Sequence, residues 1–127
     1  MPFDNPPGTP FGEIELLWDA RSRISSRDHW VKRRYRYGDR YCLVAALSVT
    51  SGSQSYNSAN HVERRLTRLL AEQLPATSAY WAPKFFTARW RLTCFNDNAR
   101  TRHEDVIGLF DRAIGQLTSE VPAQVSP

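Results

Sequence analysis

The stretch YCLVAALSV, residues 41–49, is the part of this sequence that decides the fold. It has no polar side chain between Cys42 and Leu47, so a helix built from it would be apolar on every face. Such a helix is stable in water only where other elements pack around it. The sequence therefore predicts a central helix near 40–49 with Asp39 as its N-cap, although a run this short is also compatible with a buried strand.

Three further segments carry the apolar stripes that would cover this helix. Residues 13–25, 59–74 and 101–118 place apolar side chains at helical spacing and polar ones elsewhere. The clearest stripe consists of Val62, Leu66, Leu69, Leu70 and Leu74. We therefore expect a mainly α fold, a single compact domain of about four helices.

Polar residues in front of the last helix are typical of a helix start. Thr101 and Glu104 have the spacing of a capping box, in which the Thr hydroxyl and the Glu carboxylate each accept from the other residue's amide. Upstream, Asn96 and Asp97 are typical of a turn whose side chains bond their own backbone. We interpret all four as structural capping residues.

The segment 27–41 is basic and aromatic. Its part from Arg27 to Arg40 holds six basic and two acidic residues, an excess equal to the net charge of +4 of the whole chain. Aromatic and basic side chains alternate in it, which predicts either a short β-hairpin near 29–37 or an extended loop. Gly38 makes a break after it.

Arginines interleaved with aromatic rings can contact phosphates and stack on bases. The candidate nucleic-acid-binding residues are Trp30, Lys32, Arg33, Arg34, Tyr35, Arg36 and Arg40. The alternative is a solvated basic face whose rings are anchored inward. No helix-turn-helix, zinc-finger or RNP motif accompanies the segment.

Two other function classes stay open. Aromatic residues are dense in the region 80–95, which is typical of a face used by a protein-interaction module or accessory subunit. A cysteine hydrolase would use Cys42 as nucleophile, His103 as base and Asn96 or Asp97 to orient it. The apolar surroundings of Cys42 argue against this activity, because burial raises the pKa of a thiol.

Composition limits the remaining choices. A chain of 127 residues forms one domain, here expected over 11–118, between a flexible Pro-rich leader (1–10) and a flexible tail (119–127). No apolar run is long enough to cross a membrane and no signal peptide is recognisable, so we expect a cytoplasmic location. Two cysteines and three scattered histidines lack metal-ligand spacing, so neither a metal nor a cofactor is expected.

Several short motifs resemble a bacterial and phage domain of unknown function. They are GDRYCLVAAL (38–47), FND (95–97) and TRHEDVIGLFDRAI (101–114), and their order agrees with that family over residues 13–118. The resemblance implies a helical domain of bacterial or phage origin, with structural roles for Cys42, Asn96 and Asp97. It implies no activity.

Together these observations favour a non-enzymatic binding protein. Nucleic acid is the first partner expected and another protein is the second. The sequence leaves the oligomeric state open.

Overall fold

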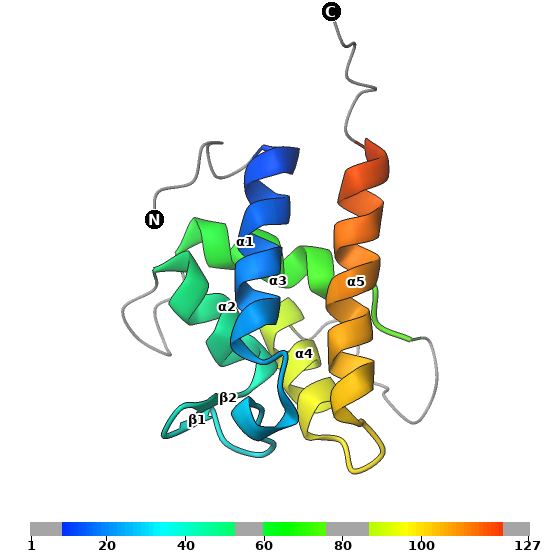
Figure 1. Ribbon diagram of the computed structural model, residues 1–127. Coiled ribbons are helices and arrows are strands. Elements are labelled where there is room, and N and C mark those ends of the chain that lie inside the picture. Colours follow the sequence, from blue (N-terminus) through cyan, green and yellow to red (C-terminus); the bar gives the residue numbers. More distant parts are fainter. Residues whose placement is uncertain (1–8, 53–59, 76–86, 121–127) are drawn as a thin grey trace, which may run out of the picture.

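The computed structural model describes residues 9–52, 60–75 and 87–120 (Figure 1). This part of the chain is mostly helical and forms one compact domain, which confirms the mainly α fold. Its elements are α1 (Pro10–Arg23), the 3-10 turn η1 (Arg27–His29), β1 (Arg36–Tyr37), β2 (Arg40–Tyr41), α2 (Leu43–Ser51), α3 (His61–Ala71), α4 (Ala88–Asp97) and α5 (His103–Glu120).

Helix α2 lies at the centre of the domain. Its residues from Leu43 to Ser48 are all buried. It contacts α1, α3 and α4, while α5 packs along α1 and α4 packs on α3 (Figure 1). The prediction of a central helix is confirmed, because an all-apolar helix can avoid water only in this position.

Helix α1 begins earlier than the predicted residue 13. The Thr9 hydroxyl caps it by accepting a hydrogen bond of 3.1 Å from the Gly12 amide, and Pro10 follows at the first helical position. Proline is favoured there because its missing N–H would have no helical partner. Residues 9 and 10 of the predicted leader thus belong to the helix start, and the rest of the leader lies outside the described residues.

Helix α2 begins later than predicted, and its N-cap is not Asp39. The Cys42 thiol holds that position and accepts from the Ala45 amide over 3.3 Å. Arg40 and Tyr41 cannot join the helix, because they form β2. Asp39 lies in the hairpin turn, with its carboxylate 3.6 Å from the His29 ring.

The β-hairpin lies at residues 36–41 and not at 29–37. Arg36 pairs with Tyr41 and Tyr37 with Arg40, and Gly38 takes the turn with a φ of +63°. The glycine that we interpreted as a break before a helix is therefore the turn of the hairpin itself. A parallel bridge from Trp30 to Tyr41 lays the preceding chain along β2.

Helix α4 was not predicted. The sequence indicated a turn at Asn96 and Asp97, yet the chain is helical from Ala88 to Asp97, with Thr87 as N-cap. Its buried residues, Leu92, Phe95 and Asn96, are too few to make a recognisable stripe. Residues 76–86 lie outside the described part.

The other two predicted helices exist with shifted ends. Helix α3 spans 61–71 and not 59–74, because the Asn60 side chain caps it and accepts from the Glu63 amide over 2.8 Å. Helix α5 runs to Glu120, so only residues 121–127 of the predicted tail lie outside the described residues. Within the described ranges, no helix combines the length and apolarity needed to cross a membrane.

Candidate nucleic-acid interface

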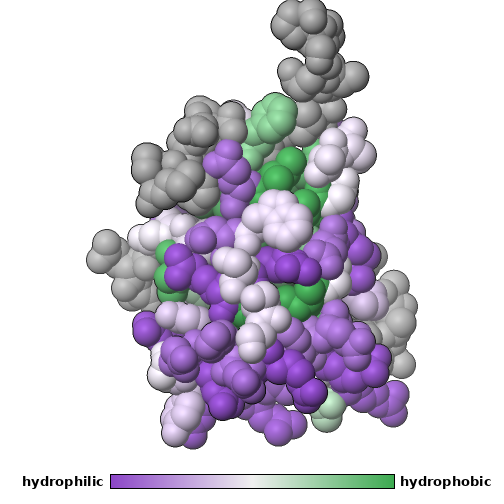
Figure 2. Space-filling model, in the orientation of Figure 1, coloured by the Kyte–Doolittle hydropathy of each residue, from purple (hydrophilic) through white to green (hydrophobic). Residues whose placement is uncertain are grey.

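The basic segment, residues 27–41, covers the end of the molecule where α4 ends and α5 begins (Figure 1). Figure 2 shows hydrophilic side chains gathered over the same end. The segment contains η1, an irregular stretch and the hairpin. Little regular structure holds it in place, so side chains from elsewhere must do so.

Asn96 of α4 is the main anchor of the basic segment. It is fully buried, and its Oδ1 accepts from the Trp30 indole N–H (2.7 Å) and from the Leu43 amide (3.1 Å). Its Nδ2 donates to the Val31 carbonyl (3.1 Å) and to Asp97 Oδ1 (2.9 Å). One side chain thus ties the segment to both α4 and the start of α2.

Asp97 is the second anchor. Its Oδ1 accepts from the Arg33 amide over 2.7 Å, and Arg33 has a φ of +63°. Arg33 is the one residue besides glycine that has a positive φ in the described chain. Asn96 and Asp97 therefore end α4 and bind a distant segment, whereas the sequence predicted a turn that bonds its own backbone.

Four arginines in the hairpin and just before it, which we call the hairpin arginines, face solvent. Arg33, Arg34, Arg36 and Arg40 are exposed, and within the described ranges none of them forms an ion pair with a carboxylate. The Arg34 guanidinium lies 4.9 Å from the centre of the Tyr37 ring, and the Arg36 guanidinium lies 4.9 Å from that of Tyr41. Cation–π contacts hold these two side chains without neutralising them.

The aromatic residues of the segment divide into two groups. Trp30, Tyr35 and Tyr41 are half-buried and pack against the core, and burial raises the pKa of Tyr35. Tyr37 is 59% exposed. The three inward rings hold the segment in place. Of the aromatic residues of this segment, Tyr37 alone is open to a stacking partner.

Lys32 is less available than the arginines. Its Nζ donates to the Asn98 carbonyl over 2.7 Å and lies 5.6 Å from the centre of the Trp30 ring. Burial, followed by the nearby Arg33, lowers its pKa below the usual value. Of the predicted binding residues, the structure thus groups the arginines outward and places Trp30, Lys32 and Tyr35 inward.

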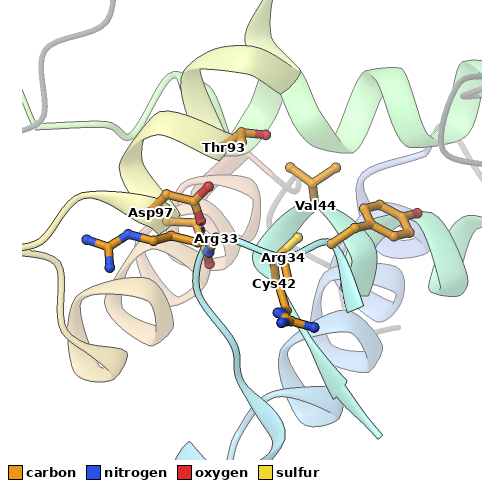
Figure 3. Close-up of a pocket in the computed structure, with 8 residues that line it drawn as sticks. Arg33, Arg34, Cys42, Val44, Thr93 and Asp97 are labelled. Carbon is orange, nitrogen blue, oxygen red and sulfur yellow. Dashed lines mark hydrogen bonds between the residues drawn. The ribbon is translucent and has the colours of Figure 1, made fainter. Parts of the chain in front are cut away.

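A cavity of about 210 Å³ opens beside this segment (Figure 3). Its walls come from the basic segment, α2 and α4. Figure 3 shows Arg33 and Asp97 next to each other on one side of the cavity, and Cys42 and Val44 on the other. The cavity therefore unites the basic segment with residues that are far away in sequence.

The hydrolase alternative lacks its base, because Cys42, Asn96 and Asp97 line the cavity beside the basic segment and His103 lines a different one. Burial raises the pKa of the Cys42 thiol to about 11, against a weaker lowering by the Ala45 amide, so the thiol is protonated at neutral pH. His103 lies at a different cavity, where its Nε2 is 2.6 Å from the Ile24 carbonyl. Cys94 is only half-buried, and both thiols are free. Within the described residues no group of three or more His, Cys, Asp or Glu is placed to hold a metal ion.

The predicted capping box at α5 does not form. The Thr101 hydroxyl has no hydrogen-bond partner among the described residues, and the Thr101 amide donates to the Asn98 carbonyl. The bond between a backbone amide and the carboxylate three residues later forms one position further along, where the Arg102 amide donates to the Asp105 carboxylate over 2.8 Å. Turn formation at Asn98 uses the Thr101 amide and so shifts the helix start.

Much of the aromatic region 80–95 falls outside the described residues. Of its described rings, Phe95 is buried in the core and Trp90 is 48% exposed. Sequence reasoning missed Glu63, which is fully buried on α3 and accepts from the Ser48 hydroxyl over 2.7 Å. The other carboxylate oxygen of Glu63 is 3.7 Å from Arg89 Nε. In the sequence, Glu63 follows the cap Asn60 by three residues, and this spacing was the signal that Glu63 belongs to a helix start.

A comparison with models of known protein families gives a match. Residues 10–116 match the model of a family of unknown function, DUF6197. The chain belongs to this family. The match to DUF6197 confirms an uncharacterised domain family over nearly the range that the sequence motifs indicated. Neither curated proteins nor solved structures give a match.

Proposed function

We propose that this DUF6197 chain binds nucleic acid, with the phosphate backbone lying across the hairpin arginines. The observation that carries the proposal is the set of four exposed arginines without a carboxylate partner in the described chain. Guanidinium groups bind phosphate bidentately and release counterions when they do so. Tyr37 adds one exposed ring for base stacking.

The anchoring of the segment supports the same proposal. Hydrogen bonds to Asn96 and Asp97 hold the Trp30 side chain and the backbone at Val31 and Arg33. A preformed site loses less conformational entropy when it binds its ligand. The proposal includes a cytoplasmic location in a bacterium or phage-infected cell, where such a protein would meet nucleic acid.

The test is oligonucleotide binding at several salt concentrations, with single-stranded and duplex DNA. Four phosphate contacts predict that log K falls against log salt with a slope of roughly −3 for single strands. Reversing charge at Arg33, Arg34 and Arg36 together should make that slope shallower than about −1 and abolish detectable binding at physiological salt.

A matched control separates local contacts from net charge. Arg64, Arg68 and Arg112 are also exposed, lie outside the basic segment, and give the same change in net charge when reversed together. Binding should survive in this control. Equal loss in both triple variants would show that the hairpin has no specific role.

The second candidate is a protein partner at the aromatic region 80–95. Trp90, which is 48% exposed on α4, is the observation that favours it. Exposed tryptophans are enriched at interfaces. Light scattering of the purified protein tests self-association, and Trp90→Ala should abolish any that is found.

A further inference from the structure

A second cavity, of about 440 Å³, lies between the basic segment and the start of α5. Arg27, Trp30 and Lys32 line one side, and residues 101–104 line the other. The volume is within the range of small-molecule sites. None of the four hairpin arginines lines it.

The start of α5 leaves hydrogen-bond donors unused at this cavity. The amides of His103 and Glu104 have no acceptor in the described chain. Thr101 is only 2% exposed, and its hydroxyl has no hydrogen-bond partner within the part of the chain that the structure describes. An unpaired buried hydroxyl is costly, and the amides of a helix N-terminus attract anions.

The charges around the cavity favour an anion. Arg27, Lys32 and Arg102 face one lining carboxylate, that of Glu104. Arg102 is already engaged, at 3.2 Å from the Glu104 carboxylate and 3.8 Å from that of Asp105. Arg27 has no carboxylate partner in the described residues, so its charge is available to a ligand.

Two rings give the cavity a wall for an organic group. The ring centres of Trp30 and His103 are 5.7 Å apart and the planes are tilted. The Ile24 carbonyl can only accept a hydrogen bond, so the His103 Nε2 that lies 2.6 Å from it must carry the proton. This bond holds the imidazole ring in place beside the indole.

We propose that this cavity binds a phosphate monoester. The phosphate would accept from the first amides of α5, from the Thr101 hydroxyl and from Arg27, while the organic group contacts Trp30. The site goes beyond the proposed function, because it uses none of the hairpin arginines. Its ligand is either a free monoester, such as a nucleotide, or the 5′-phosphate at the end of a nucleic-acid strand.

The test is an NMR titration of the full chain with adenosine 5′-monophosphate, with adenosine and inorganic phosphate as comparisons at matched ionic strength. The amides of residues 101–104 and the Trp30 indole N–H should shift with the monophosphate. Adenosine should leave them unchanged. Absence of these shifts at millimolar nucleotide, or equal shifts with adenosine, would overturn the proposal.

Single substitutions then locate the site. Arg27→Gln and Thr101→Val should each weaken binding by about tenfold or more, as expected for a lost charge-assisted hydrogen bond. Glu104→Gln should tighten binding, because it removes a carboxylate beside the phosphate. Arg40→Gln is the matched control, since it removes the same charge on the hairpin, and binding should not change. Unchanged spectra elsewhere establish that each variant is folded, and binding equal to wild type in Arg27→Gln and Thr101→Val contradicts the site.

The two sources of phosphate are separated with oligonucleotides. Tighter binding of a 5′-phosphorylated strand than of its 5′-hydroxyl counterpart indicates the strand end, and equal binding of the two indicates a free monoester. The variant reversed at Arg33, Arg34 and Arg36 should still bind the mononucleotide. A variant that loses only oligonucleotide binding is therefore altered at the hairpin arginines. A variant that loses only mononucleotide binding is altered at this cavity.

Discussion

At position 96 a fully buried amide makes four hydrogen bonds, two through its oxygen and two through its nitrogen. An asparagine side chain has two acceptor sites and two donors, so its capacity is completely used. Aspartate has the same shape but no N–H. The requirement at this position is therefore for an amide, and a polar side chain of equal size does not meet it.

Asn96→Asp should lower the free energy of unfolding by about 3 kcal/mol, because it leaves the Val31 carbonyl unpaired and places a buried charge beside Asp97. Urea denaturation measures the change. Asn98→Asp is the control, since the Asn98 side chain is only half-buried and should lose less than about 1 kcal/mol. Equal losses would show that the Asn96 network contributes little.

At the scale of elements, the end of the hairpin sets the residue at which α2 begins. Gly38 turns the chain so that β2 ends at Tyr41, and Cys42 then starts the helix directly. Before the hairpin, Arg33 takes a left-handed conformation that costs a residue with a Cβ roughly 1 kcal/mol. Such strain persists where the surroundings impose it, here through the bond from the Arg33 amide to Asp97.

Arg33→Gly should raise the free energy of unfolding by up to about 1 kcal/mol, since glycine adopts a positive φ without strain. The same variant should weaken oligonucleotide binding, because one phosphate contact is lost. Thermal unfolding and a binding titration measure the two effects. Arg34→Gly is the control, because its φ is not positive, and it should weaken binding without any gain in stability. A stability loss in Arg33→Gly would mean that the arginine side chain itself stabilises the loop.

At the scale of the whole molecule, one apolar helix organises the rest. Cys42, at the start of α2, is only 6% exposed and lies at the arginine-lined end of the domain. Through this thiol, the stability of the domain depends on pH in the alkaline range. Burial raises the pKa of this thiol from 9.0 to about 11.

The sign of this effect follows from the raised pKa. The contribution of this thiol to stability is constant below pH 9 and is lost as the pH rises through about 11, because the unfolded chain loses the proton first. Cys42→Ser removes the titration and keeps a hydroxyl that can cap α2. At pH 11 the wild type should have lost about 2 to 3 kcal/mol more than this variant, measured by urea denaturation from pH 8 to 11. Parallel pH profiles of the two proteins would contradict a buried thiol.

Sequence by itself determined the helical class, the central place of α2 and the existence of α1, α3 and α5. These features depend on local periodicity and on the exclusion of apolar side chains from water. Both can be recognised in a sequence window of ten to twenty residues. The concentration of arginine in the basic segment is legible in the same way.

Only the tertiary structure decided what the polar residues do. Asn96 meets Trp30 across 66 positions of sequence, and Arg33 meets Asp97 across 64. Nothing local to any of these residues specifies its partner, because the partner is set by how α4 packs beside α2. For the same reason, the free hydroxyl of Thr101 and the cavity in front of α5 follow from packing, and the sequence there suggested only a helix cap.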